Sequence, residues 1–258
     1  MFSRTLTARP ALAPPRSKTY RQSTMSKLRI DIWSDIACPW CFVGKRRLEA
    51  ALERFPHAAE VEVVWRAFEL DPSAPRERDP NESHAERLAK KYGMSVEQAT
   101  ARTAQLTETA RRDGLDFDFE HIRPGNTFDA HRLVHLAEER GLQDAVKERF
   151  LRAYLTEGEA IGNPQVLQRL AVEAGLPAAE VERVLSTDAY AKEVRADEQE
   201  ARELGINGVP FFVFDERLAA SGAQPPEVLL GALNQAWNER APKPEVFAEG
   251  AVCGPDGC

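Results

Sequence analysis

The chain has few cysteines, four among its 258 residues, and it has no apolar stretch long enough to cross a bilayer. A membrane-spanning helix needs about 20 consecutive apolar residues, so we do not expect an integral membrane protein. With 43% hydrophobic and 29% charged residues, the composition is ordinary for a globular protein. At this length, one domain with a large insertion and two separate domains are the open alternatives.

The first 27 residues lack acidic side chains but hold six basic ones and three prolines. A secretory signal needs an apolar run of about seven to fifteen residues, and the longest run here, residues 11–15, is short and broken by proline. An acid-free leader rich in Arg and Ser also matches a mitochondrial transit peptide. Met25, just before the first predicted strand, instead indicates a native start. We favour a disordered extension with no role in the fold, and we predict a cytoplasmic location.

The positive charges of this extension offset a strongly acidic remainder. The whole chain has a net charge of −7, and removing the six basic side chains of residues 1–27 leaves −13. Such a charge favours solubility and disfavours nucleic acid as a partner.

Two of the four cysteines form the C-P-W-C motif of residues 38–41, at the junction between an apolar β-branched stretch and a helix-like pattern. If Cys38 is the N-cap and Pro39 takes the first helical position, the Cys38 sulfur faces the unsatisfied amides of the helix. These amides and the helix dipole stabilise an anion, so the Cys38 thiol should ionise readily and act as the nucleophile. Cys41, one turn later, would be the resolving thiol.

Two less reactive roles of this pair have to be weighed. It is half of a potential zinc site, and the other cysteines, Cys253 and Cys258, form a C-x4-C at the end of the chain. Structural zinc pairs usually lie on short hairpins rather than across a proline-initiated helix start, so we predict no metal site. A structural disulfide here would close almost no loop and would add little stability. Redox chemistry is therefore the favoured role.

Strand and helix patterns alternate on both sides of the motif. Residues 28–33 and 61–68 have the pattern of strands and residues 41–55 that of a helix between them, which predicts a parallel β-α-β unit. After a Pro- and charge-rich link, the pattern is almost wholly helical, with a capping box at Ser95 and an Asn-Pro helix start at 163–164. The helices predicted in this segment cover residues 95–114, 127–141, 142–155, 163–175 and 188–204.

The chain then returns to strands at residues 209–214 and 218–222, whose spacing suits an antiparallel hairpin, and closes with a helix over 226–237. The overall prediction is an α/β fold interrupted by a helical insertion. The predicted bounds are 1–27 for the extension, 28–72 and 205–240 for the α/β domain, 73–204 for the insertion, and 241–258 for a flexible tail with the C-x4-C.

Three motifs, in this order, resemble the DsbA-like proteins of the thioredoxin fold. The closest resemblance is to their FrnE-type branch, which is related to 2-hydroxychromene-2-carboxylate isomerases. The motifs are S-D-I-A-C-P-W-C-F-V-G at residues 34–44, N-T-F-D-A-H-R at 126–132 and G-V-P-F-F at 208–212. The resemblance covers about residues 28–237. It implies a thioredoxin-like fold with a large all-helical insertion.

The resemblance also implies that the Val209–Pro210 peptide bond is cis and lies against the C-P-W-C pair, with the Val209 backbone available to an extended substrate. An ordinary trans proline at a strand start is the alternative. In the glutathione-dependent isomerases that this sequence resembles, an Asn-Thr pair lies near the active site, which makes Asn126 a candidate substrate-binding residue. A plain loop or cap residue fits its position equally well. We interpret His131 as a partly buried structural histidine rather than a catalytic one.

Charged residues near the motif allow further roles. Asp35 can accept the Cys41 proton during exchange, or it can raise the pKa of the dithiol as a like charge. Lys45, Arg46 and Arg47 lie beyond the first helical turn, and we interpret them as a solvated face.

The second cysteine pair is absent from most thioredoxin-like sequences, although some FrnE-like sequences end in a similar pair. Glycine and proline flank Cys253 and Cys258. The pair could therefore form a loop disulfide and exchange with Cys38 and Cys41 at the high effective concentration of a tethered group. Our hypothesis is an internal electron relay, and the alternative is a flexible end with incidental thiols.

The predicted function is that of a thiol-disulfide oxidoreductase or isomerase acting on disulfide-containing proteins or glutathione. It needs no metal or organic cofactor, with glutathione as a candidate co-substrate. The alternative is a glutathione-dependent isomerase or transferase acting on small aromatic compounds, but such relatives typically carry serine at the position of Cys38. A zinc-binding module is the third interpretation, and monomer and homodimer are both open. The predicted site residues are Cys38 and Cys41 (catalytic), Pro39, Trp40, Asn126, Val209 and Pro210 (substrate-binding), and Cys253 and Cys258 (relay).

Overall fold

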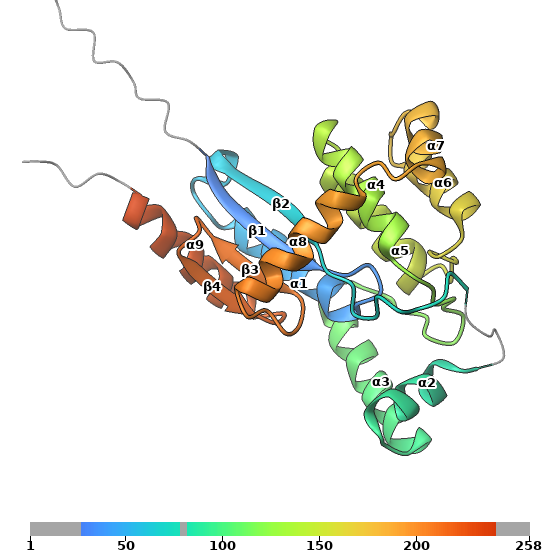
Figure 1. The fold of residues 1–258 in the computed structure, drawn as a ribbon. Helices are drawn as coiled ribbons and strands as arrows, with labels where there is room; N and C mark the ends of the chain where they lie inside the picture. The colour runs from blue at the N-terminus through green and yellow to red at the C-terminus, as the bar shows by residue number, and fades with distance from the viewer. Residues whose placement is uncertain (1–26, 78–81, 241–258) are drawn as a thin grey trace, which may run out of the picture.

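The computed structural model describes residues 27–77 and 82–240, whose backbone folds around a mixed β-sheet with the strand order β2-β1-β3-β4 (Figure 1). β1 (Leu28–Ser34) and β2 (Val61–Ala67) are parallel, as predicted, since a helix connects them. β3 (Phe211–Phe214) runs antiparallel to β1, and β4 (Leu218–Ser221) returns beside β3 as the predicted hairpin. A short 3-10 helix, Ala58–Glu60, precedes β2.

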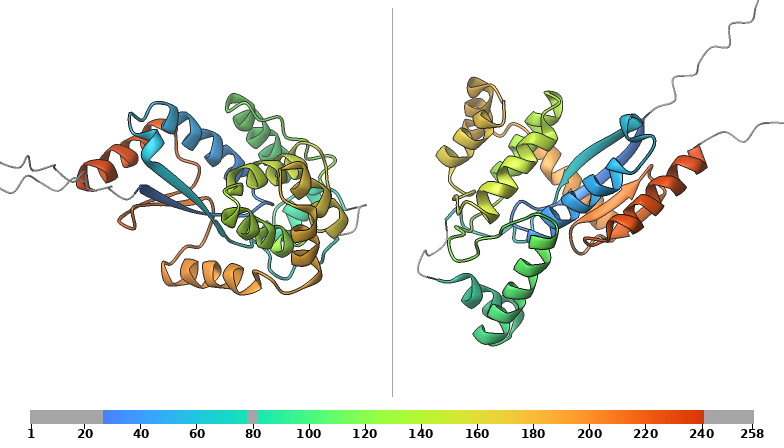
Figure 2. Two further views of the ribbon diagram at one scale, coloured as in Figure 1. Left: turned by 90° about the horizontal axis from the view of Figure 1, so that it is seen from above. Right: turned by 180° about the vertical axis from the view of Figure 1, so that it is seen from behind.

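Helices cover both faces of this sheet (Figure 2). α1 (Pro39–Glu53), the crossover helix, and α9 (Pro226–Arg240) pack against each other on one face, whereas α8 (Ala191–Glu203) lies on the other. Successive side chains of β1 point to opposite faces of the sheet and so reach both layers. Its Leu28, Ile30 and Ile32 belong to the large core shared with α1 and α9, and its Trp33 packs separately against α8.

Helices α2 to α8 fill the long segment between β2 and β3. The sequence predicted α3, α4, α5, α6 and α8, and the expected caps are present at Ser95 and Asn163. It missed α2 (His84–Tyr92), although Ser83 and Glu86 form a capping box there. It also missed α7 (Ala178–Ser186). The domain bounds themselves remain predictions. The bounds of the remaining helices are Val96–Arg112 (α3), Phe128–Glu139 (α4), Gln143–Leu155 (α5) and Pro164–Glu173 (α6).

The helical segment protects the exposed edge of the sheet at β2. The Gln143 side chain accepts a hydrogen bond from the Trp65 amide at 2.8 Å and donates one to the Trp65 carbonyl at 3.0 Å. Asp197 of α8 accepts from the Ala67 amide at 2.8 Å. These side chains satisfy edge groups that would otherwise attract another strand. They also fix α5 and α8 against the sheet.

The pair α2 and α3 forms an arm that stands apart from α4 to α7 (Figures 1 and 2). The two helices pack chiefly against each other. The arm overhangs the start of α1. Among the described residues, no helix is both long and apolar enough to cross a membrane.

α1 and the loop before β3 approach each other closely at Gly44. A Cβ atom at Gly44 would lie 2.9 Å from Cγ of Pro210 and 3.2 Å from Cζ of Phe212. The missing side chain is therefore what allows Pro210 to lie against α1.

We expect Gly44→Ala to destabilise the fold. Overpacking typically costs about 1–3 kcal/mol, and the better helix propensity of alanine offsets up to about 1 kcal/mol, so the free energy of unfolding in urea should fall by about 1 kcal/mol. Gly231→Ala in α9 is the control, because nothing lies within 4 Å of the added Cβ atom there. It should gain up to about 1 kcal/mol. Equal gains in both variants would contradict the close contact.

Candidate active site

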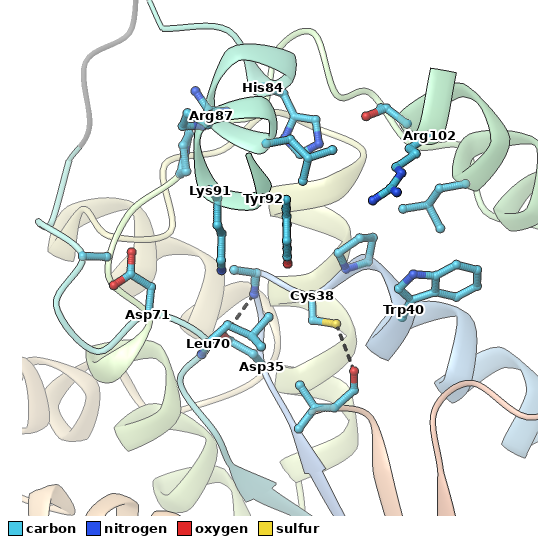
Figure 3. Close-up of a pocket in the computed structure, with 18 of the residues that line it drawn as sticks. Asp35, Cys38, Trp40, Leu70, Asp71, His84, Arg87, Lys91, Tyr92 and Arg102 are labelled. Carbon is cyan, nitrogen blue, oxygen red and sulfur yellow. Dashed lines mark hydrogen bonds between the residues drawn. The ribbon is translucent and has the colours of Figure 1, made fainter. Parts of the chain in front are cut away.

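The C-P-W-C pair lies where β1 leads into α1, as predicted. Cys38 is the N-cap of α1 and Pro39 is its first residue. Of the helix amides predicted to face the Cys38 sulfur, the Cys41 amide acts to lower the pKa of Cys38, although the sulfur makes no capping hydrogen bond. It lies 3.5 Å from the carbonyl oxygen of Val209 instead (Figure 3). A carbonyl oxygen only accepts hydrogen bonds, so the Cys38 thiol can donate its one proton either to this carbonyl or to the Cys41 sulfur, but not to both at once.

Cys41 carries the more acidic thiol of the pair. The hydrogen bond with Cys41, followed by burial, raises the pKa of Cys38 well above its ordinary value, and the Cys41 amide counters this only in part. Burial also acts to raise the pKa of Cys41, but the Cys38 thiol, the Ser34 hydroxyl and the charge of Lys147 together lower it. The two sulfurs titrate as a unit. The causes acting on the pair favour a thiolate on Cys41 over one on Cys38.

A buried lysine lies behind the pair. Lys147 of α5 is 0% exposed, and its ammonium donates a hydrogen bond of 3.2 Å to the backbone carbonyl of Ser34. Burial lowers the pKa of Lys147 to about 8, against the opposing effects of Cys41 and Asp35. A buried ammonium is costly unless an anion lies nearby, so we infer that Lys147 and the Cys41 thiolate stabilise each other. The sequence reasoning did not single out this residue.

Asp35 and His131 form a second buried pair beside the dithiol. Oδ1 of Asp35 lies 3.4 Å from Nε2 of His131, and Oδ2 accepts from the Leu70 amide at 2.8 Å. Burial acts to raise the pKa of Asp35, but His131 and the Leu70 amide outweigh it and lower the pKa. The Asp35 charge contributes to the raised pKa of Cys38, which favours the like-charge role over that of proton acceptor. His131 is buried, and burial lowers its pKa, as befits a structural histidine.

Cys38 opens into a pocket of about 1070 Å³. Pro39, Trp40 and Val209 line it beside Cys38, and the arm of α2 and α3 forms the opposite wall (Figure 3). The Val209–Pro210 peptide bond is cis, as the resemblance implied. Trp40 is 42% exposed at this pocket. The structure therefore brings the predicted substrate-binding residues Pro39, Trp40 and Val209 together, while their roles in binding remain predictions.

Asn126 lies apart from this group. Its Oδ1 accepts from the Phe128 amide at 2.9 Å, and its Nδ2 donates to Glu69 at 3.1 Å. Gly125 and Thr127, on either side of it, line the pocket, whereas Asn126 is not among the lining residues. These contacts match the alternative of a plain loop residue, one position before Thr127, the N-cap of α4. Its proposed contact with a substrate remains a prediction.

The interpretation of Lys45, Arg46 and Arg47 as a solvated face is wrong for Lys45. Its side chain is 3% exposed and forms ion pairs with Glu49 of α1 and with two carboxylates of α5. The two carboxylates of α5 are distant from Lys45 in the sequence, so the sequence pattern around Lys45 does not show that they contact it. Arg46 and Arg47 are also partly buried. Arg46 forms ion pairs with Glu49 of α1 and with Glu148 of α5, and Arg47 forms one with Asp113.

Within residues 27–77 and 82–240, no group of three His, Cys, Asp or Glu side chains is arranged to hold a metal ion. Cys253 and Cys258 lie outside these described residues. Their predicted relay with the C-P-W-C pair thus remains a hypothesis.

This fold occurs in a known family. The model of the DSBA-like thioredoxin domain matches residues 29–234, so the chain belongs to this family. A probable DsbA oxidoreductase from Streptomyces coelicolor is 49% identical, with a TM-score of 0.78, covering 90% of this chain and 98% of that one. YwbO, an uncharacterised protein of Bacillus subtilis, is 29% identical, covering 76% of this chain and 91% of its own.

A 2-hydroxychromene-2-carboxylate isomerase has the same fold with a TM-score of 0.58 at 16% identity, covering 82% of this chain and 97% of its own. The predicted thioredoxin-like α/β fold with a helical insertion is thus confirmed. The same fold thus occurs in a probable oxidoreductase and in an isomerase. The fold alone therefore does not select the reaction.

We expect Lys147→Met to raise the pH at which the dithiol loses its first proton, by about one unit, because the variant lacks a positive charge beside Cys41. The pKa of Lys147 is about 8, so the difference from the unmodified protein should be largest below pH 8 and should vanish above it. Ultraviolet absorbance of the thiolate measures this titration. Lys192→Met, at an exposed lysine of α8, is the control. Identical titration curves for all three proteins would refute the pairing of Lys147 with Cys41.

Proposed function

We propose that the protein catalyses thiol-disulfide exchange, with Cys38 as the nucleophile and Cys41 as the resolving thiol. The observation that carries this proposal is the asymmetry of the pair. Cys38 lines the open pocket, whereas Cys41 is 0% exposed behind it and does not line the pocket. An incoming disulfide can therefore reach Cys38 first.

Reduction of a substrate starts with transfer of the Cys38 proton to the Cys41 thiolate. The Cys38 thiolate then attacks one substrate sulfur, forming a mixed disulfide and releasing the other sulfur as a thiolate. That thiolate takes the proton of Cys41. Cys41 next attacks the Cys38 sulfur, which closes the Cys38–Cys41 disulfide and releases the second substrate sulfur, protonated by water. Two electrons pass from the dithiol to the substrate.

The same steps in reverse oxidise a dithiol. Isomerisation occurs when a second thiolate of the substrate, instead of Cys41, attacks the substrate sulfur of the mixed disulfide, forms a new disulfide within the substrate and releases the Cys38 thiolate. The direction depends on the reduction potentials of the pair and its partners. We propose disulfide-containing proteins as substrates and glutathione as the small thiol that exchanges with the pair, without a bound metal or organic cofactor. Equilibration of the Cys38–Cys41 pair with reduced and oxidised glutathione measures the potential.

We expect Cys41→Ser to accumulate a mixed disulfide with insulin, because attack by Cys38 can occur and resolution cannot. Cys38→Ser should trap no substrate, and its reduction of insulin should fall to the rate of dithiothreitol alone. Mass spectrometry of the trapped species and the turbidity of reduced insulin measure the two outcomes. Trapping by Cys38→Ser instead would reverse the roles, and full activity of both variants would refute the proposal.

The alternative, a glutathione-dependent isomerase of small aromatic compounds, explains the site less well. Such a reaction has no use for a second sulfur. Here Cys41 lies directly behind Cys38, and Ser34 and Lys147 act to lower its pKa. An isomerase activity that survives in Cys41→Ser would favour the alternative.

The tail pair is proposed to relay electrons to the active site. If it does, Cys253→Ser/Cys258→Ser should keep its first turnover with substrate, while its re-reduction by dithiothreitol or glutathione should slow measurably. Single-turnover and steady-state rates separate the two steps. Unchanged rates in both would show that the tail thiols are incidental.

We propose the cytoplasm as the compartment, on the composition of residues 1–27 given above. Fractionation of cells that express the full chain tests this. Sedimentation of the purified chain decides between monomer and homodimer.

A further inference from the structure

The wall of the pocket opposite Cys38 carries positive charge. Lys91 and Tyr92 of α2 extend toward Cys38, and Arg102 of α3 points into the same space on the side of Trp40 (Figure 3). These cations stand out in a chain whose net charge is −7.

Lys91 and Arg102 are exposed and have no ion pair or hydrogen bond with the other described residues. Nζ of Lys91 lies over the ring of its neighbour Tyr92, 5.7 Å from the ring centroid. Arginines elsewhere on the surface are commonly paired, as Arg140 is with Glu180. Two cations facing the reactive sulfur without a carboxylate partner are therefore available to an anion from outside.

Several other charged or titratable groups of the pocket are engaged within the protein or neutral. Asp71 accepts a hydrogen bond from Ser73, and Arg87 donates one to the backbone carbonyl of Glu82. Burial and the charge of Arg87 lower the pKa of His84 to about 4, so this histidine is neutral at pH 7.

One more exposed cation, Lys90, borders the pocket next to Lys91 and adds to the positive charge of the same wall. Lys91 and Arg102 are the two that Figure 3 shows extending into the space around Cys38 and Trp40. They are thus the cations best placed to contact a substrate held at the sulfur.

The pocket is large enough for a stretch of polypeptide. Its volume of about 1070 Å³ lies at the upper limit of the range of about 300–1,000 Å³ usual for small-molecule sites. Trp40, Leu70 and Tyr92, three exposed large apolar side chains, line it around Cys38. Apolar contacts close to the sulfur and cations beside them suit a chain segment that carries carboxylates next to its cysteine.

We propose that Lys91 and Arg102 select protein disulfides whose cysteines are flanked by Asp or Glu. This inference rests on the proposed exchange function and adds the class of substrate. The carboxylates of the substrate pair with the arm of α2 and α3 while Cys38 attacks the neighbouring sulfur.

The test uses three matched peptides with one internal disulfide each, whose residues next to the cysteines are Glu, Gln or Lys. The reduced full-length protein is mixed with each peptide in a single turnover, and quenched samples are separated by chromatography. We expect the rate constant for the Glu peptide to exceed that for the Gln peptide about fivefold, and the Lys peptide to be slowest. The preference should shrink at high salt.

The double variant Lys91→Gln/Arg102→Gln should bring the ratio of Glu to Gln rate constants close to one. The ratio compares two substrates of the same variant, so a general loss of folding or activity cancels. Arg112→Gln, at the exposed end of α3 and away from the pocket, should keep the ratio of the unmodified protein. An unchanged ratio in the double variant would overturn the assignment to these two residues.

Equal rates for all three peptides in the unmodified protein would overturn this inference and leave the exchange function standing. No reduction of any peptide would overturn both. Glutathione disulfide serves as a fourth substrate. If the double variant slows that substrate but keeps the peptide ratio, the cations serve the tripeptide and not a protein segment, and the inference is wrong.

Discussion

The cost of placing a charged sulfur inside the protein governs the whole site. Burial acts to raise the pKa of both cysteines, and a pair that stayed fully protonated at neutral pH would be a poor nucleophile. The Cys38 thiol and the positive charge of Lys147 act to lower the pKa of Cys41. These effects favour the negative charge on the inner sulfur, whereas the outer sulfur lies 3.5 Å from the Val209 carbonyl oxygen. Reactivity then requires a proton shift between two adjacent sulfurs, which needs no other base.

One face of α5 connects this electrostatic arrangement to the fold. Gln143 and Lys147 are four residues apart, so they lie on the same side of the helix. Gln143 bonds to the backbone of β2 at Trp65, and Lys147 bonds to the backbone of β1 at Ser34. The contact of Gln143 with the sheet edge holds α5 in place, and it thereby also fixes the position of the Lys147 ammonium behind the dithiol. Stability of the edge and acidity of the sulfur depend on the same helix.

Much of the fold could be predicted because its signals are local. Neighbouring residues alone predict the order of strand, helix and strand in residues 28–68. They also predict the helix caps at Ser95 and Asn163 and the position of the C-P-W-C pair at a helix start. The ionisation of the pair could not be predicted, because it depends on Lys147, which belongs to a helix of the insertion. Lys147 interrupts the apolar stripe of α5 that includes Phe150, and this interruption was the available signal. Lys45 was misread for a similar reason, since two of its three anionic partners come from α5.

The two parts of the chain therefore contribute different things to the site. The sheet with α1 and the loop before β3 supplies the sulfurs and the cis Val209–Pro210 bond. The helical segment supplies the buried charge of Lys147 and the exposed wall with Lys91 and Arg102. Because Lys147, Lys91 and Arg102 all belong to the helical segment, substitutions there can change the charge around the dithiol without altering the residues of the sheet. On the proposed function, the thioredoxin-like part provides the reaction, and the insertion determines how readily and on which disulfides it occurs.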